Sequence, residues 1–232
     1  MSDIGINGET ARKIFESAIR TTPDLLSGRG SGNKPIDHVV YECYVYALVL
    51  QVLHELNYNP RAVYLQSQTF AWRPRRGKVY HNPKKYSHVE FTANGKDFVL
   101  LNDIEVHCKS PGVELEVDVL ILSKQHFDDC LNSKPPLSPS YSELRLLLEA
   151  KHYSSDIDIS VSKAFVGMCD RLRDGKCFAI LVSKSGFTFG GRTLLDGVVP
   201  SLNRQGMVFG TLTKPHVTCL MMELKTSFLM KL

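Results

Sequence analysis

Two otherwise apolar segments of the sequence carry charged residues. Asp118 stands within VDVLIL, and Glu149 and Lys151 follow directly after three leucines in LLLEAKHY. Both segments have the pattern of buried strands, in which residues two apart share a face of the sheet, so Glu149 and Lys151 are expected to lie side by side. A carboxylate and an ammonium group at the end of a buried strand are costly to desolvate unless they pair or bind a metal.

If these two strands are neighbours, Asp118 and Glu149 supply the oxygen ligands that Mg²⁺ prefers. A bound Mg²⁺ polarises a phosphodiester and helps to generate hydroxide from water. Lys151 would then orient and help deprotonate that water, or stabilise the additional charge on the phosphate. The simpler alternative is a Glu149–Lys151 ion pair at a strand end, which is a common arrangement. The spacing alone leaves both interpretations open.

The segments around these residues predict one α/β domain, in which a mixed sheet is flanked by helices. Alternating apolar residues predict strands, apolar residues at helical spacing predict helices, and Asn94-Gly95 predicts a hairpin turn. The expected elements, in chain order, are an amphipathic helix at 9–20, a flexible connector at 28–34, a buried helix at 39–56, strands at 61–70, 86–93, 97–101, 114–122 and 143–153, a helix at 159–173 and a strand at 177–183.

Two regions are expected to be irregular. Residues 126–142 contain three prolines and several serines, and they predict a loop with at most one short helical turn. The glycine-rich tail from Gly186 onward, including Gly190-Gly191-Arg192-Thr193, predicts loops, short strands and a final segment at 217–230. Residues 1–37 are expected to form an N-terminal helix and linker, and 38–232 a single domain.

The pair VDVLIL and LLLEAKHY resembles the PD-(D/E)XK nuclease superfamily, which has the restriction-endonuclease-like fold. In that family an Asp opens one central strand and the (D/E)XK motif lies on the next. The resemblance assigns Asp118 and Glu149 as metal ligands and Lys151 as the catalytic lysine. It also assigns a catalytic role to Glu42, the acid near the start of the long apolar helix. Val117 stands where the motif name has Pro, and Glu149 lies 31 positions after Asp118, which implies a proline-rich insertion.

The resemblance implies a core of helix, strand, strand, strand, helix and strand from about residue 38 to 183. It further implies a Mg²⁺-dependent endonuclease, with Mn²⁺ as a substitute, that cleaves DNA rather than RNA in bacterial restriction or antiviral defence. Many related enzymes are dimers that cut both strands, so a homo-oligomer is the expected assembly.

A basic segment follows the first predicted strand. No Asp or Glu occurs between Arg61 and Lys85, and this interval holds a tryptophan among several cations. Clustered cations bind a phosphate backbone and aromatic rings stack on bases. The residues expected to contact nucleic acid are Trp72, Arg73, Arg75, Arg76 and Lys78. The alternative is a solvated basic hairpin, which is the usual role of a charge run.

The composition excludes several classes of protein. The chain has 232 residues, 43% hydrophobic residues and a net charge of +4, which argues against disordered and fibrous classes. No apolar run approaches the roughly 18 residues of a membrane span, and the first residues lack a secretory pattern, so a cytoplasmic protein is expected. Its six cysteines form no CxxC pair, which argues against structural zinc and favours reduced, buried thiols.

Three functions remain open at this level. The leading hypothesis is the Mg²⁺-dependent endonuclease. The second is a non-catalytic nucleic-acid-binding module of the same fold. The third is an effector nuclease that a small molecule or partner activates through the glycine-rich tail.

Overall fold

The structure is a computed structural model that describes most of the chain from Ile36 onward. The predicted helix at 9–20 and the connector at 28–34 lie outside the described residues. The described residues are 36–63, 70, 72–73, 77–79, 86–172, 174, 177–201, 207–211 and 214–232.

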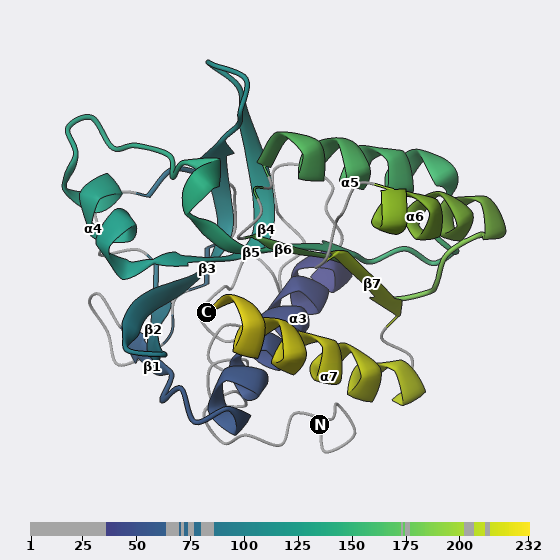
Figure 1. Cartoon of the computed structure of the whole chain (residues 1–232), viewed down its shortest axis with the longest axis horizontal. Helices are drawn as coiled ribbons and strands as arrows, with labels where there is room; N and C mark the ends of the chain where they lie inside the picture. Colours follow the sequence, from purple (N-terminus) through teal and green to yellow (C-terminus); the bar gives the residue numbers. More distant parts are fainter. Residues whose placement is uncertain are drawn as a thin grey trace.

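A mixed sheet runs through the centre of the described structure (Figure 1). Its seven strands lie in the same order as in the chain. The first five strands pair with one another in antiparallel fashion, and the last three, which include the fifth, are mutually parallel. The strands are β1 (Arg61–Val63), β2 (His88–Ala93), β3 (Lys96–His107), β4 (Glu114–Ser123), β5 (Leu144–Lys151), β6 (Phe178–Ser183) and β7 (Met207–Thr211). The predicted α/β class with a mixed sheet is confirmed.

Helices cover both faces of this sheet (Figure 1). One face carries α3 (Ile36–Glu55) and α7 (Lys214–Lys231), and the other carries α5 (Ile159–Leu172) and α6 (Phe189–Ser201). The helix α3 is apolar on nearly every side, and Tyr46, Leu48 and Leu50 are fully buried in it. Burial of apolar surface against both faces gives the domain two apolar layers, with the sheet between them.

The hairpin predicted from Asn94-Gly95 joins β2 to β3, and both turn residues have positive φ, 49° and 75°. Two central residues with φ above zero match the twist of the flanking strands, which is why this dipeptide favours the turn. Strand β3 continues past the predicted end at residue 101 and reaches His107. The polar pair Asn102-Asp103 looks like a strand end in the sequence, but both residues stay inside the strand.

Both regions expected to be irregular contain a helix that was not predicted, α4 in the first and α6 in the second, whereas a short strand and the final segment predicted for the tail are present as β7 and α7. Residues 124–132 form α4, because the Ser123 side chain caps it by accepting from the His126 N–H at 3.3 Å. Phe127 and Cys130 give this helix its buried face. A short 3₁₀ helix, η3 (Tyr141–Glu143), follows before β5.

In the glycine-rich tail, a glycine allows two helices to pack closely. Gly191 lies in α6, and a Cβ atom there would come within 2.9 Å of the Ser162 hydroxyl on α5. Only glycine allows the two helices to approach so closely at this point.

Five cysteines are buried free thiols, as predicted: Cys43, Cys108, Cys130, Cys169 and Cys177. No helix in the described part of the chain combines the length and the apolarity that crossing a bilayer requires.

Candidate active site

The predicted site lies where β4 separates from β5. The ladder between these strands runs only to the pair Val119–Leu148, whereas the ladder between β3 and β4 continues to His107–Glu114. The β3–β4 hairpin therefore leaves the sheet, as Figure 1 shows, while β5 continues beside β6. We call the gap between the two diverging strands the fork.

Asp118 lies at the base of the fork and is 5% exposed. Its Oδ2 atom accepts a hydrogen bond from the Ala150 N–H at 2.8 Å. The carboxylate therefore binds a backbone N–H of β5 beyond the point where the β4–β5 ladder ends. Ala150 itself packs into the apolar layer on the α3 side, as the strand alternation predicts. The strand separation thus brings a carboxylate into the sheet where a backbone carbonyl would otherwise stand.

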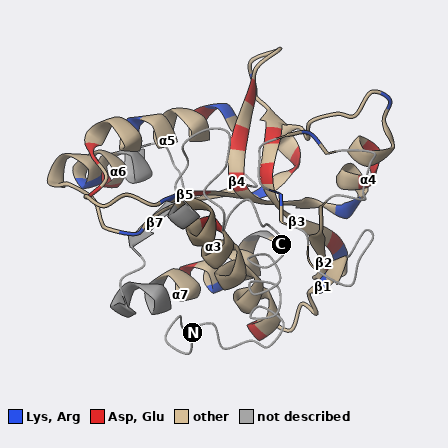
Figure 2. Cartoon of the chain, turned by 180° about the vertical axis from the view of Figure 1, so that it is seen from behind, with Lys and Arg blue, Asp and Glu red and all other residues tan. Residues whose placement is uncertain are grey.

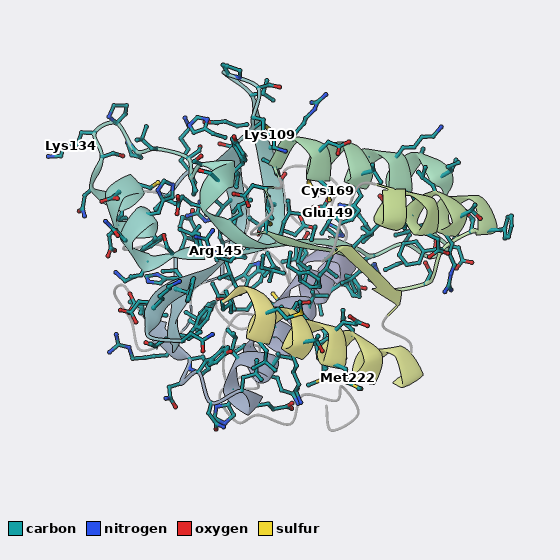
Figure 3. All side chains as sticks on the ribbon, in the orientation of Figure 1. Lys109, Lys134, Arg145, Glu149, Cys169 and Met222 are labelled. Atoms are coloured by element: carbon teal, nitrogen blue, oxygen red, sulfur yellow. The ribbon has the colours of Figure 1, made fainter. Side chains whose placement is uncertain are left out.

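The structure brings the three motif residues together. Lys151 Nζ lies 3.9 Å from Asp118 Oδ2 and contacts Glu149 Oε1 directly. Glu149 and Lys151 point to the α5 side of the sheet, and Figure 3 labels Glu149 in this position. The second carboxylate oxygen of Glu149 is buried and has no hydrogen-bond partner among the residues that the structure describes.

Glu42 enters the site from the opposite face. It lies on α3, is 2% exposed, and contacts His38 Nε2 at 2.8 Å. One carboxylate oxygen each from Glu42, Asp103 and Asp118 lie within 4.8 Å of one another. The predicted helical glutamate therefore does lie beside the predicted strand aspartate.

Asp103 is a site residue that the sequence analysis missed. It lies on β3 between the ladder pairs Asn102–Val119 and Ile104–Val117, which places it across from Asp118. Its φ is +50°, an uncommon value for a residue other than glycine. The Asn102 amide donates to its Oδ2 at 2.8 Å. An acid within an apolar strand was the signal that revealed Asp118, and Asp103 gives the same signal in VLLNDIEV.

Negative charge at the fork exceeds the positive charge that faces it. Burial and the neighbouring Glu42 and Asp118 carboxylates raise the pKa of Asp103 well above its usual range. Burial, followed by the Asp118 charge, raises the pKa of Glu149 to about 8, although Lys151 opposes this shift. Figure 2 shows acidic residues recurring along the β3–β4 hairpin.

The pKa of Lys151 is also raised, which for an amine favours the charged form. Burial disfavours its charged form, but the Glu149 and Asp118 carboxylates outweigh burial and raise its pKa. Lys151 therefore remains an ammonium group in this environment.

The donor set fits a hard divalent cation. All its ligand atoms are carboxylate oxygens, which suit Mg²⁺ and Mn²⁺ better than the soft metals that thiolates select. The buried Oε2 atom of Glu149 has no hydrogen-bond partner among the described residues, which makes it a further candidate ligand atom. The closest approach of three carboxylates involves Glu42, Asp103 and Asp118, whereas Glu149 contacts Lys151. The predicted ligand pair is thus part of a larger acidic set.

The basic segment has a structural role in its described part. Trp72 is 3% exposed and packs edge-on against Tyr46 of α3, with ring centroids 5.3 Å apart. Arg73 is 7% exposed, and its guanidinium lies 4.4 Å from the centre of the Tyr86 ring. Both side chains are interior, so in this structure neither presents a group to a nucleic acid.

The same segment supports the acidic site. The Arg73 carbonyl accepts from the Asn102 amide at 3.0 Å, and the Gly77 N–H donates to the Asp103 carbonyl at 3.2 Å. Lys78 forms an ion pair with Glu114 at 3.3 Å. Arg75 and Arg76 lie outside the described residues. A nucleic-acid role for Lys78, Arg75 and Arg76 stays a prediction.

A scan against models of known protein families found no match to this chain, and a search of curated proteins found no similar sequence.

Proposed function

We propose that this protein is a metal-dependent nuclease of the restriction-endonuclease-like fold, which hydrolyses phosphodiester bonds at the fork. One observation carries the proposal. Asp118, Glu149 and Lys151 occupy two adjacent strands at the point where the strands separate, and Glu42 reaches the same carboxylate from α3.

The order of the elements around the fork supports the same proposal. Helix α3, strands β3, β4 and β5, helix α5 and strand β6 occur in this order in the chain, although other elements lie between some of them. They pack together, with β6 parallel to β5. This is the order that the resemblance to the PD-(D/E)XK superfamily implies. Strands β1, β2 and β7 then extend the sheet at its two edges.

Each residue of the fork has a distinct task in this proposal. Asp118, Glu149, Glu42 and Asp103 would hold Mg²⁺, or Mn²⁺ in its place. When bound, such an ion polarises the phosphodiester and makes a coordinated water more acidic. Lys151 stays charged beside two carboxylates, so it stabilises the additional charge on the phosphate and orients water, rather than accepting a proton.

The substrate and setting follow from the resemblance and belong to the same proposal. DNA is favoured over RNA, restriction or antiviral defence is the proposed role, and a dimer would allow both strands to be cut. A cytoplasmic location is consistent with such a role.

The test is cleavage of plasmid, linear duplex DNA, single-stranded DNA and RNA by the purified protein, with Mg²⁺, Mn²⁺ or EDTA. We expect cleavage that needs Mg²⁺ or Mn²⁺ and stops in EDTA. A matched control is Glu90→Gln, which removes one carboxylate from β2 outside the fork. Binding of DNA without cleavage under any of these conditions would favour a non-catalytic module. Cleavage only after addition of a cell extract or nucleotide would favour an activated effector.

A further inference from the structure

A pocket of about 400 Å³ opens directly beside Glu149 and Lys151, between the base of the β3–β4 hairpin and helix α5. Its volume falls in the range of about 300–1,000 Å³ that is usual for small-ligand sites. Its walls are mainly apolar, with a small number of polar groups. The principal lining residues are Leu115 and Glu116 of β4, and Val161, Phe165, Met168 and Arg171 of α5.

The spacing along α5 explains why this side of the helix forms a wall. The buried stripe of α5 contains Ser162, Phe165, Cys169 and Leu172. Val161, Ala164, Met168 and Arg171 follow the same three- and four-residue spacing one position earlier, so they form the adjacent stripe. The hairpin tip meets the end of this helix, where the Lys109 N–H donates to the Arg171 carbonyl at 2.9 Å.

Two of the lining residues are themselves motif residues. Glu149 and Lys151 belong to the pocket wall and to the fork, so a phosphate at the fork has its neighbouring nucleotide at the pocket mouth. The apolar wall suits the flat face of a base. The Glu116 carboxylate can accept a hydrogen bond from the amino group of a base. The Arg171 guanidinium can donate one to a ring or phosphate oxygen.

We infer that this pocket takes the base of an unpaired nucleotide next to the scissile phosphate. The inference rests on the proposed nuclease function and refines its substrate class. A base in a duplex is paired and stacked, so it reaches a pocket of this kind only after extrusion, whereas a single strand presents it at no such cost. The preferred substrate is therefore single-stranded DNA, a strand end or a duplex with an unpaired base.

Gly167 offers a sharp test. It lines the pocket, and a Cβ atom at this position meets no atom within 4 Å, so Gly167→Trp adds a bulky side chain at the pocket wall without a clash at Cβ. Gly197→Trp is the matched control: Gly197 lies in helix α6 with equally open space around its Cβ position, and it is not among the pocket residues. Equal melting temperatures of the two variants confirm that both fold.

The readout is the KM and kcat of each protein on three kinds of substrate. These are a single-stranded oligonucleotide, a duplex, and a series of single strands in which one nucleotide position after another is made abasic. We expect Gly167→Trp to raise KM for the single strand by about tenfold or more, a loss of about 1.4 kcal/mol in binding, with kcat nearly unchanged. Gly197→Trp should match the wild type. An abasic position next to the cleaved bond should weaken wild-type binding and leave Gly167→Trp unaffected.

Unchanged KM in Gly167→Trp, or a flat abasic scan with a duplex preference, would overturn the inference. The failure of the proposed function is a separate outcome, in which wild-type protein cleaves none of the substrates. In that case the methyl NMR signals of Val161 and Met168 test the pocket by titration with deoxynucleoside monophosphates. Shifts in the wild type that Gly167→Trp abolishes support base binding, and their absence in the wild type rules it out.

Discussion

Two charged clusters of this protein use similar residues in opposite ways. Near α4, Lys124 Nζ lies 2.5 Å from Asp128 and 3.4 Å from Glu90, and Arg61 also pairs with Glu90, at 2.9 Å. At the fork, several carboxylates face a single ammonium group, Lys151. We call the first group the α4 cluster. Each of its carboxylates has a cation beside it, and its members are partly exposed.

The carboxyl pKa values shift in opposite directions in the two clusters. Burial tends to raise the pKa of Glu90, but hydrogen bonding from Arg61 and the charge of Lys124 outweigh it, so the pKa is lowered. Burial and like charges act together on Glu149 and Asp103, and both pKa values are raised. The carboxylates of the α4 cluster are paired with cations, whereas at the fork Lys151 faces more carboxylates than its single charge can balance. Strongly raised carboxyl pKa values in a buried cluster are a feature of functional sites, and a bound cation is the simplest compensation.

The largest expected contrast between the clusters is in activity. Asp118→Asn removes one charge from the fork with little change in shape, and it should lower the rate of DNA cleavage by at least about 10²-fold, as loss of one preorganised electrostatic group does. Lys151→Met should have an effect of similar size. Glu90→Gln should cleave at the wild-type rate. Wild-type cleavage by Asp118→Asn at saturating Mg²⁺ would disprove the assignment of the fork.

Thermal stability in the presence of metal provides the second contrast. Mg²⁺ or Mn²⁺ should raise the Tm of the wild type and of Glu90→Gln, because an ion that binds only the folded state stabilises it by mass action. At a metal concentration of 100 times Kd this amounts to about 2.7 kcal/mol. Asp118→Asn should show no increase. Equal shifts in all three proteins, measured by calorimetry, would place the ion outside the fork.

The dependence of stability on pH should differ in sign between the clusters. In the unfolded chain a Glu ionises near pH 4.3, whereas Glu149 in the folded protein holds its proton up to about pH 8. The folded state therefore binds more protons between these values, and its free energy of unfolding falls as the pH rises, with a slope of up to about 1.4 kcal/mol per pH unit. Glu90, whose pKa is lowered, contributes stability above about pH 4.3 that is lost as the pH falls.

Chemical denaturation in EDTA between pH 5 and pH 8 measures this slope. Glu149→Gln should make stability less dependent on pH in this range, because the variant has no proton to lose. An identical slope in Glu149→Gln and the wild type would show that Glu149 ionises normally in the folded protein.

The sequence was informative where a residue conflicted with its own neighbours. Asp118 and Glu149 stand out because apolar strand residues surround them, and that local conflict predicted two strands and the residues of the fork on them. Strand separation at Val119–Leu148 is a property of two ladders together, so no local pattern reveals it. Asp103 was missed because Asn102 precedes it, and together they look like a turn.

The sequence was misleading where burial depends on distant partners. Trp72 and Arg73 have the composition of an exposed nucleic-acid-binding loop, yet Tyr46 of α3 and Tyr86 cover them. Side-chain type indicates which interactions are possible, but the fold decides which of them form. In α6, similarly, Gly191 belongs to a glycine-rich segment that suggested a loop, yet it allows close contact with α5.

The smallest expected effects are changes in the free energy of unfolding when one carboxylate is removed in the absence of metal. The change should be opposite in sign for the fork and for the α4 cluster. Asp103→Asn keeps an acceptor for the Asn102 amide and removes a carboxylate that Glu42 and Asp118 repel, so at pH 8 in EDTA it should stabilise the protein by about 1 kcal/mol. Glu90→Gln breaks two partly exposed ion pairs and should destabilise it by about 0.5 kcal/mol. With Mg²⁺ present, the gain from Asp103→Asn should shrink, because the variant loses an ion ligand along with the repulsion. Calorimetric Tm values of the wild type and the two variants, each with and without Mg²⁺, measure these changes. Destabilisation by Asp103→Asn in EDTA would mean that its carboxylate is compensated within the protein, and the contrast between the fork and the α4 cluster would then fail at this residue.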